Sequence, residues 1–569
     1  MSRTDTPSTS EPTSGARIAA LESALAAANE RVAALEAERD KLRAAYERQR
    51  LDLELLRRRI FVAKAERIDT AQLELEFAGK LAALDAIAEK LDDETSSDDR
   101  PSAPGRPARK KPLGRRDLRE AHLPEERIVI TNPILDALVA RGEAEAIGYE
   151  ESCKLGWKRG GLHRIVVARI KYRLPGNSPE TTTIATAEKP AETFERSLAA
   201  PSLIARIAVD KYCDGLPLHR QEDRFSRQGV RIDRGTMCRW MEDAGATAGA
   251  TVIAAMREEA LRTAYCIATD ATGVAVQPLP DHKKRQPCRR GHYFVQIADR
   301  DHVFFEYTPK ETSAAVSAML KGFKGYVQAD AKSVYDALFR PPEKPPDDGS
   351  DSMLPTEVGC WSHCRRKFWE ATVAKDAVAR EGLARIGRLF GLERKWQGQP
   401  HVEVRTLRHE YARPHVEAFF EWAEIEYEKV EGQRGLLRSA LGYAVRQREP
   451  LMRYLDDGRL EMTNNRSERE LRRIAVGRHA WLFVGSDDHA ESAGHLFSLI
   501  ASARLHSLDP EVYLRDLFRL LAHWPRDRYL ELSPRYFAAT RARIDPAQLA
   551  AELGPLTIPA LPPQTVEEK

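Results

Sequence analysis

The sequence predicts a multidomain protein with an N-terminal helical arm, a helical region, an α/β domain interrupted by helices, and a C-terminal helical tail. Three observations support this prediction. The 569 residues are too many for one compact core. A heptad pattern of apolar residues runs through the first part of the chain. From residue 262 onward, strand-like runs alternate with helix-like runs, which is typical of α/β domains.

The composition excludes several classes of protein. Apolar residues make up 42% and charged residues 31%, as expected of a globular protein with polar extensions. No run of about 18 apolar residues is present, so we expect no membrane partner. The N-terminal MSRTDTPSTSEPTSG lacks an apolar signal core. The seven cysteines form no CxxC pair, so neither a disulfide framework nor a standard zinc site is indicated, and a reducing cytoplasm is the simplest location.

The N-terminal arm combines a polar end, a coiled-coil pattern and a linker. Residues 1–15 are predicted to be disordered. Residues 16–92 carry apolar side chains at alternating spacings of three and four, among them Ile18, Leu21, Leu25, Val32 and Leu35. Such a narrow stripe needs a partner helix, so we expect a homo-oligomer formed through a coiled coil, with folding back on the same chain as the alternative. Residues 93–118 form a basic, Pro-rich linker, which either follows a phosphate backbone or is merely solvated.

Two small regions follow the linker. Residues 119–198 are predicted to be a small mixed region, in which RIVVARIKYRL alternates as a strand does. Residues 199–260 are predicted to be helical. They include two helices joined by a short turn, with Gly229 in the turn and Asp233 as the cap of the second helix. A helix-turn-helix that binds DNA is one interpretation, and a plain pair of antiparallel helices is the other.

The α/β pattern occupies residues 262–374. AYCIATDATGVAVQ and HYFVQIADRDHVFFEYT predict three strands, ETSAAVSAMLKGF a helix, GYVQAD a strand, KSVYDAL a helix, EVGCWSH a strand and CRRKFWEATVAKDAVA a helix. This order is that of an RNase H-like domain, whose first three strands form an antiparallel meander. Residues 375–458 predict an all-helical insertion, residues 459–506 the second part of the domain, and residues 507–569 a helical tail. The second part opens with TNNRSERELRR, a helix for which Asn464 or Asn465 is the expected N-cap.

Three carboxylates have the positions needed for phosphodiester chemistry. Asp270 lies on the first predicted strand, Asp330 at the end of the fourth, and Glu468 on the late helix. The first and fourth strands are neighbours in an RNase H-like sheet, so the two Asp side chains can meet at one edge. Clustered carboxylates can hold two metal ions, which activate water and stabilise the leaving oxygen. Alternatively, either Asp alone is a turn former or a helix cap.

Several long blocks resemble transposases of the IS66 family of bacterial insertion sequences, over roughly residues 50–520. The blocks are LLRRRIFVAKAERID, SLIARIAVDKYCDGLPLHRQEDRFSRQGVRIDRGTMCRWM, GYVQADAKSVYDAL, GCWSHCRRKFWEA and the segment from MTNNRSERELRR to PEVYLRDLF. The resemblance implies a DDE transposase with Asp270, Asp330 and Glu468 as catalytic metal ligands, and two Mg²⁺ or Mn²⁺ ions. It implies transposon-end DNA and target DNA as substrates, accessory transposition proteins as further partners, and a place near the bacterial nucleoid in the cytoplasm.

Side chains around the three carboxylates suit phosphate contact. Cys360 and His363 form a CxxH pair; even with Cys364 they supply too few ligands for zinc, so a hydrogen-bonding role is favoured, with His363 at the scissile phosphate. Arginine makes paired hydrogen bonds to phosphate, although a charged helix surface balanced by acids is the alternative. The predicted DNA-binding residues are Arg365, Arg366, Lys367, Arg469, Arg473 and Arg478.

The chain also departs from the family pattern. Family members usually carry Asp-Glu-Thr at the first Asp and Asp-Gly-Tyr at the second, where this chain has Asp270-Ala271-Thr272 and Asp330-Ala331-Lys332. The stretch that corresponds to a Cys-rich zinc finger in many members retains only Cys153. Two alternatives therefore stay open: a catalytically silent, transposase-derived DNA-binding protein, and a nuclease that cuts without joining.

Overall fold

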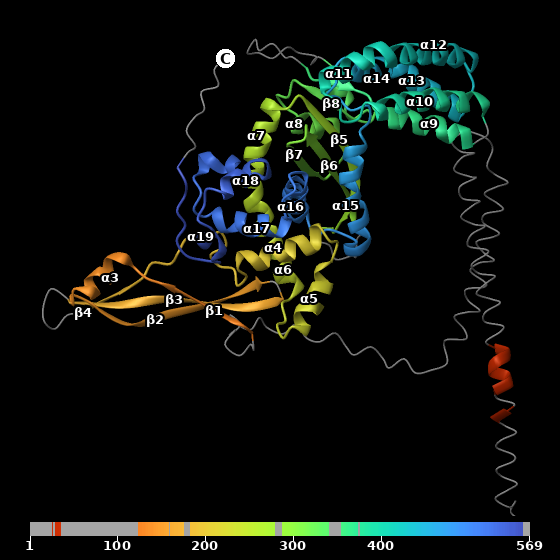
Figure 1. Ribbon diagram of the computed structural model, residues 1–569. Helices are drawn as coiled ribbons and strands as arrows, with labels where there is room; N and C mark the ends of the chain where they lie inside the picture. The colour runs from red at the N-terminus through yellow and green to blue at the C-terminus, as the bar shows by residue number, and fades with distance from the viewer. Residues whose placement is uncertain are drawn as a thin grey trace, which may run out of the picture. The chain divides into compact units, whose positions relative to one another are not determined.

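The computed structural model describes residues 25–26, 29–35, 123–158, 160–175, 182–278, 287–340, 354–373 and 376–560 (Figure 1). Contacts divide the chain into two units, one of residues 1–113, 367–381 and 424–442 and one of the remaining residues. The predicted disordered end, most of the predicted coiled coil and the basic linker lie outside the described residues. Residues 25–26 and 29–35 are helical, and Leu25, Val32 and Leu35 of the heptad stripe are 62%, 54% and 54% exposed.

A long, narrow sheet forms the region predicted to be mixed. β3 pairs with β2 and, near its C-terminal end, with β4, and both pairings are antiparallel. β1 pairs with β3 in parallel. RIVVARIKYRL lies in β3, so the strand prediction is confirmed. The elements are β1 (Glu125–Ile130), α3 (Pro133–Ala140), β2 (Glu145–Lys158), β3 (Gly161–Pro175) and β4 (Thr182–Thr186).

Four helices connect this sheet to the next. They are α4 (Pro201–Tyr212), α5 (Leu218–Arg227), α6 (Arg234–Ala248) and α7 (Ala254–Thr263), with a π-helical turn at Gly249–Ile253. The predicted helix, turn, helix is confirmed in form as α5 and α6. Gly229 has a φ of 86° in the turn, and the Asp233 carboxylate accepts the Gly235 N–H of α6 at 2.8 Å. Gly245 lets α6 approach α16 closely, because a Cβ there would lie 2.2 Å from the carbonyl oxygen of Ser492.

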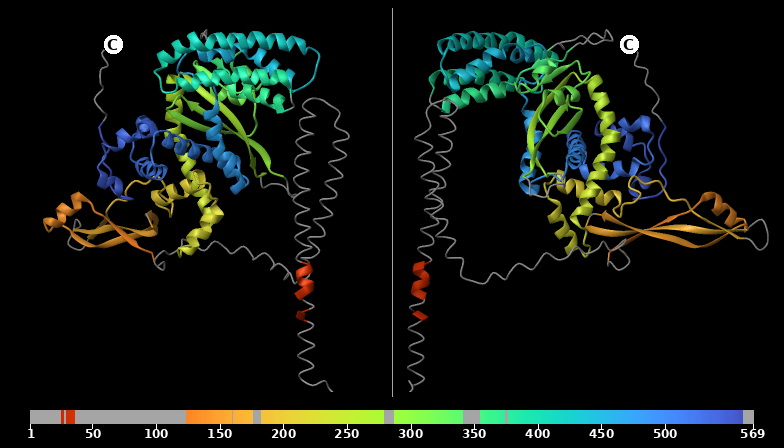
Figure 2. Two further views of the ribbon diagram at one scale, coloured as in Figure 1. Left: turned by 45° about the vertical axis from the view of Figure 1, so that its right-hand side comes forward. Right: turned by 180° about the vertical axis from the view of Figure 1, so that it is seen from behind.

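The second sheet has the strand order β7-β6-β5-β8-β9. β5, β6 and β7 form an antiparallel meander, whereas β8 and β9 run parallel to β5, so the predicted meander and the pairing of the first and fourth strands are confirmed. Figure 2 shows α15 beside this sheet, where it packs along β5. The elements are β5 (Cys266–Val276), β6 (Arg289–Ala298), β7 (His302–Thr308), α8 (Ser313–Met319), β8 (Tyr326–Gln328) and β9 (Thr356–Val358).

Two predicted helices differ from the structure. KSVYDAL was predicted to be a helix but contains only a 3₁₀ turn at Asp336–Leu338. Two prolines follow at 341 and 342, and proline disfavours the α conformation of the residue before it, so the turn is not extended into an α-helix at its C-terminal side. The helix predicted from Cys364 begins earlier, as α9 (Trp361–Val373), and the buried indole of its first residue donates to the Leu451 carbonyl oxygen at 2.8 Å.

The predicted insertion is helical, as expected. Its elements are α10 (Ala377–Lys395), α11 (His401–Leu407), a π-helical turn (Arg408–Ala412), α12 (Arg413–Lys429), α13 (Leu436–Arg446), α14 (Arg448–Met452) and a 3₁₀ turn (Arg453–Leu455).

The C-terminal part is also helical. Ser498 and Ser502 of α16 accept the N–H groups of Phe305 and Val303, so α16 is fixed along β7. No helix within the described ranges has the length and apolar character of a membrane span. The elements are α15 (Asn465–Trp481), α16 (Asp487–Leu505), α17 (Pro510–Leu520), a 3₁₀ helix (Arg526–Leu532), α18 (Pro534–Arg541) and α19 (Pro546–Ala550).

Candidate active site

The two predicted aspartates are brought together by strand pairing. β5 and β8 pair in parallel with Ala268 opposite Gln328, and Asp270 and Asp330 each follow that pair by two residues. Their side chains are 14% and 13% exposed. The ammonium group of Lys332 lies within 4.0 Å of both carboxylates. The end of the sheet just beyond the β5–β8 pairing therefore carries two largely enclosed carboxylates.

The enclosed site makes ionisation of the Asp270 carboxyl unfavourable. Burial raises the pKa of the Asp270 carboxyl and the charge of Asp330 raises it further, while the Ala271 N–H and the charges of Lys332 and His363 oppose the increase. Asp330 Oδ1 is buried and accepts no hydrogen bond from the described residues. A buried carboxylate oxygen without a partner costs free energy until a proton or a cation approaches it.

Lys332 lies among three carboxylates. Its Nζ is 3.4 Å from Asp330 Oδ2, 3.6 Å from Glu311 Oε1 and 4.0 Å from Asp270 Oδ1. Burial acts to lower the pKa of Lys332, but the three carboxylates outweigh it, so the pKa is raised and the group stays charged. Neither Lys332 nor Glu311 was a predicted site residue. In the sequence, Lys332 stands out only because Ala331-Lys332 replaces the Gly-Tyr that usually follows the second Asp in the family. No pattern of neighbouring residues links Glu311 to Asp270 and Asp330.

Glu468 and His363 form the second half of the site. Glu468 lies in the first turn of α15 and His363 in the first turn of α9. The distance from His363 Nε2 to Glu468 Oε1 is 3.7 Å, with the side chains 23% and 47% exposed. A hydrogen bond with Cys360 raises the pKa of His363; burial opposes this, and Asp330 and Glu468 add to the increase. His363 is therefore coupled electrostatically to both halves of the site.

Asn464 ties together the elements that carry these side chains. It is fully buried, its Nδ2 donates to the Thr269 carbonyl oxygen at 2.7 Å, and its backbone N–H donates to Cys360 Sγ at 3.2 Å. Thr269 directly precedes Asp270. Asn464 occupies the predicted N-cap position of α15, but its side chain makes no capping bond, and its Nδ2 donates to β5 instead. Cys360 has a hydrogen-bonding role, as predicted for the CxxH pair.

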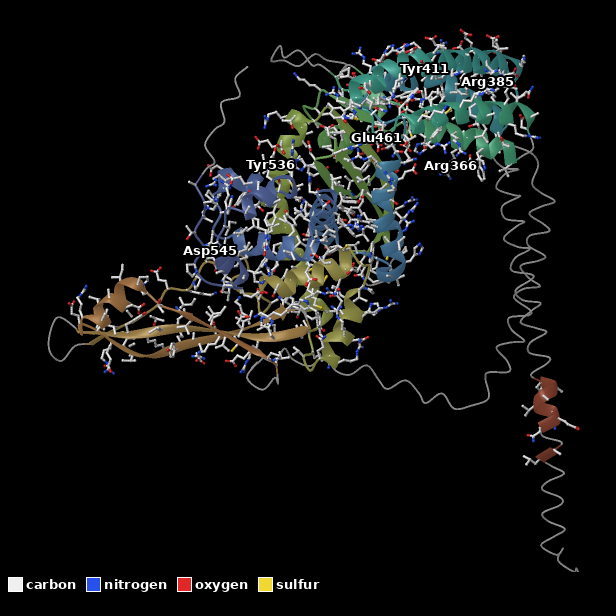
Figure 3. All side chains as sticks on the ribbon, in the orientation of Figure 1. Arg366, Arg385, Tyr411, Glu461, Tyr536 and Asp545 are labelled. Carbon is white, nitrogen blue, oxygen red and sulfur yellow. The ribbon has the colours of Figure 1, made fainter. Side chains whose placement is uncertain are left out.

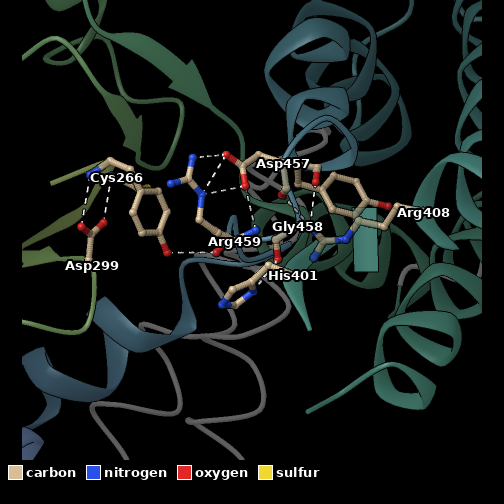
Figure 4. Close-up of polar contacts among 9 residues, drawn as sticks. Cys266, Asp299, His401, Arg408, Asp457, Gly458 and Arg459 are labelled. Atoms are coloured by element: carbon tan, nitrogen blue, oxygen red, sulfur yellow. Dashed lines mark hydrogen bonds and ion pairs between the residues drawn. The ribbon is translucent and has the colours of Figure 1, made fainter. Parts of the chain in front are cut away.

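A further set of polar contacts holds the segment that leads into α15 (Figure 4). Arg459 pairs with Asp457 at 2.6 Å, and Arg408 donates to the Asp457 carbonyl oxygen at 2.9 Å. The Tyr265 hydroxyl donates to the Arg459 carbonyl oxygen at 3.2 Å. Tyr265 directly precedes β5, so these contacts connect the strand of Asp270 with the approach to Glu468.

The donor set fits a hard divalent cation. Carboxylate oxygens are the ligands that Mg²⁺ and Mn²⁺ prefer. Within the described ranges, no three His, Cys, Asp or Glu side chains are already spaced as a complete metal cage. Asp330 Oδ1 is nevertheless a buried acceptor without a donor, and Asp270 lies beside it. Asp270 and Asp330 are thus the two residues best suited to hold such a cation.

The predicted basic residues on α15 differ in what they do. Arg469 is exposed, whereas Arg473 pairs with Glu470 at 2.9 Å. Arg478 donates to the Gly273 carbonyl oxygen at 2.8 Å, so its guanidinium connects the end of α15 to β5. Arg469 is therefore open to a ligand, Arg473 is held by Glu470, and Arg478 connects the end of the helix to β5.

A basic cavity of about 280 Å³ lies beside α15. Arg466, Arg469 and Arg473 of α15 line it together with Arg504 of α16. Arg466 also pairs with Glu461, labelled in Figure 3, at 3.1 Å. On α9, Arg365 and Arg366 are exposed and Lys367 follows them; Figure 3 labels Arg366. A cavity lined by four arginines suits an anionic ligand such as a nucleic-acid backbone.

Comparison with known proteins identifies the family. The model described as "Transposase IS66 family" matches residues 196–492, and the "IS66 C-terminal element" matches residues 498–534. The chain belongs to the IS66 family of transposases. Asp270, Asp330 and Glu468 all fall inside the first matched segment of this IS66 family member.

Relatives of this IS66 family member in Sinorhizobium fredii bear no functional name. The chain is 29% identical to the uncharacterized protein y4qI over 73% of its own length and 76% of the relative's. It is 26% identical to the uncharacterized protein y4hP over 85% and 87% of the two chains. It is 25% identical to the uncharacterized protein y4jD over 82% and 90%. The similarity extends over most of each chain.

Proposed function

We propose that this chain is a DDE transposase, which cuts DNA at transposon ends and joins those ends to target DNA. The observation that carries the proposal is the juxtaposition of Asp270 and Asp330 at one sheet edge, with Glu468 in the first turn of a helix tied to the same strand. The strand order β7-β6-β5-β8-β9, with an antiparallel meander followed by parallel strands, supports an RNase H-like catalytic domain.

Asp270, Asp330 and Glu468 would hold divalent ions, Mg²⁺ or Mn²⁺. When bound, such ions acidify the attacking water and stabilise charge on the phosphate oxygens. In the cutting step, the water oxygen bonds to phosphorus as the bond to the 3′ oxygen breaks, which leaves a 3′-hydroxyl. In the joining step, that hydroxyl bonds to a target phosphorus as a target 3′ oxygen leaves. Each step exchanges one P–O bond for another, so no covalent enzyme intermediate is needed.

Other residues would bind and orient the DNA. His363 lies beside Glu468 and, when protonated, can donate to an oxygen of the scissile phosphate. Arg365, Arg366 and Lys367 on α9 and Arg469 and Arg473 on α15 would contact flanking phosphates. The helix-turn-helix of α5 and α6 is a candidate for recognition of the transposon ends.

The N-terminal arm would assemble the active complex. Leu25, Val32 and Leu35 present an exposed apolar stripe with heptad spacing. A second copy of the same helix would cover that stripe, which supports a homo-oligomer. Paired copies suit transposition because two ends are processed together.

The test is Mg²⁺-dependent cleavage and joining of DNA that carries the element's own ends, with accessory proteins supplied. Asp330→Asn should keep DNA binding and abolish cutting, because the charge of a metal ligand is removed. Asp336→Asn is the matched control: Asp336 follows six residues later and pairs with Arg340 on the surface at 3.2 Å. The control should cut as the wild type does. Equal cleavage by Asp330→Asn and wild type would refute the assignment.

One observation favours a second candidate, a catalytically silent DNA-binding protein descended from a transposase. Lys332 holds an ammonium where cations would otherwise approach Asp270 and Asp330. If the wild type binds the ends but never cuts in Mg²⁺ or Mn²⁺, this second function replaces the first. Cleavage without strand-transfer products would instead indicate a nuclease.

A further inference from the structure

The position of Lys332 suggests more than a departure from the family sequence. Two metal ions side by side need several carboxylates to balance their charge. Here the ammonium group of Lys332 already supplies one positive charge beside those carboxylates. The ammonium lies 3.4 Å from Asp330 Oδ2 and 3.6 Å from Glu311 Oε1. It also reaches Asp270 Oδ1 at 4.0 Å. These distances are those of a cation among its counter-ions.

We propose that Lys332 is a built-in cation of the active site, so that the site takes one divalent ion where the DDE scheme has two. This proposal rests on the proposed function only for the identity of the ligands, Asp270, Asp330 and Glu468. Lys332 neutralises the side of the pair that faces Glu311. The divalent ion is left with Asp330 Oδ1, which is buried without a donor among the described residues.

Glu311 contributes a third carboxylate beside Lys332. It precedes α8, its side chain is 27% exposed, and its Oε1 is buried without a hydrogen bond from the described residues. Its other oxygen, Oε2, faces His292 Nε2 at 3.7 Å. Glu311 therefore has one oxygen directed to Lys332 and the other to His292. If the lysine charge is removed, Glu311, Asp330 and Asp270 become a set of hard oxygen ligands for a second ion.

Lys332 is a positioning residue in this scheme, since it acts through the carboxylates. Its role differs from a structural salt bridge in one measurable respect. A salt bridge that only stabilises the fold would change the melting temperature without changing how many ions bind. A built-in cation changes the number of ions.

The experiment counts Mn²⁺ bound per chain by the full-length protein, from the free Mn²⁺ signal in an electron paramagnetic resonance titration without DNA. Wild type should bind one ion that is lost in Asp330→Asn. Lys332→Met should bind two, and the double variant Lys332→Met/Glu311→Gln should return to one. Lys332→Arg keeps the charge and should bind one. Lys324→Met is the matched control, because Lys324 is exposed just before β8, and it should bind one.

The outcomes separate the proposals. Two ions or none in the wild type, or one ion in Lys332→Met, would overturn the role of Lys332. If Lys332→Met does not fold, Lys332→Gln carries the same test with a side chain that still donates hydrogen bonds. Counting needs no cleavage, so a one-to-two change in a chain that never cuts DNA would retain the built-in cation and reject the transposase activity. Cleavage with an unchanged count would do the reverse.

Discussion

Removal of the Asn464 side chain tests whether the site depends on the junction between β5 and α15. In Asn464→Ala, the Thr269 carbonyl oxygen loses the donor that now lies 2.7 Å away. Both residues are buried, with exposed fractions of 0% and 1%, so water cannot readily replace the amide. A buried polar group left without its partner costs about 1–3 kcal/mol. The folded state should be destabilised by that amount.

The effect on activity should exceed the effect on stability. Thr269 is adjacent to Asp270, and Asn464 lies four residues before Glu468, so the lost bond loosens the distance between two proposed metal ligands. A misplacement of about 1 Å can cost on the order of 10²-fold in rate. We therefore expect the cleavage rate at saturating metal to fall by about that factor, while DNA binding is retained.

The assay combines thermal melting with single-turnover cleavage of end-bearing DNA. A loss of 1 kcal/mol lowers the melting temperature of a domain of 150–250 residues by about 2–4 °C. Asn465→Ala is the control, because Asn465 is the neighbouring residue, is exposed and begins α15. The reasoning is refuted if Asn464→Ala melts and cuts as the wild type does, or if both variants lose stability and activity equally.

Three further predictions concern charge and reactivity. Without metal, Asp270→Asn should melt at a higher temperature than the wild type at pH 7. The pKa of Asp270 is raised in the folded state, so the wild type loses stability as the pH rises through that pKa and the carboxyl ionises. The difference in melting temperature should shrink toward pH ~4, where the carboxyl is protonated. A gain that persists at low pH would contradict this. Arg469→Ala should weaken DNA binding and reduce the salt slope by about one, and an unchanged slope would remove Arg469 from the interface. Iodoacetamide at pH 7 should label Cys238 before Cys266, as followed by peptide mass spectrometry. Burial acts to raise the pKa of Cys238, but the hydrogen bond with His489 and the charges of Lys211 and His489 together lower it, whereas burial raises the pKa of Cys266 to about 12; the reverse order would contradict it.

Local patterns predicted most of the second sheet and part of the site. The alternation of apolar residues is set within each strand, so β5, β6 and β7 were recognisable, and the order of elements indicated that β8 would lie beside β5. The juxtaposition of Asp270 and Asp330 followed from that pairing. The helix predicted at KSVYDAL was wrong, since the segment forms only a 3₁₀ turn at Asp336–Leu338 ahead of two prolines.

The sequence by itself determined most of the strands and helices, their order, the family, and the three acidic residues that the resemblance singles out. These features depend on periodicity and on blocks of neighbouring residues, which are visible along the chain. Only the tertiary structure decided that Glu311 meets Lys332, that Asn464 serves β5 instead of capping α15, and that Arg478 braces the helix. Those contacts join residues on different elements, and their distances depend on how the elements pack, which no local pattern encodes.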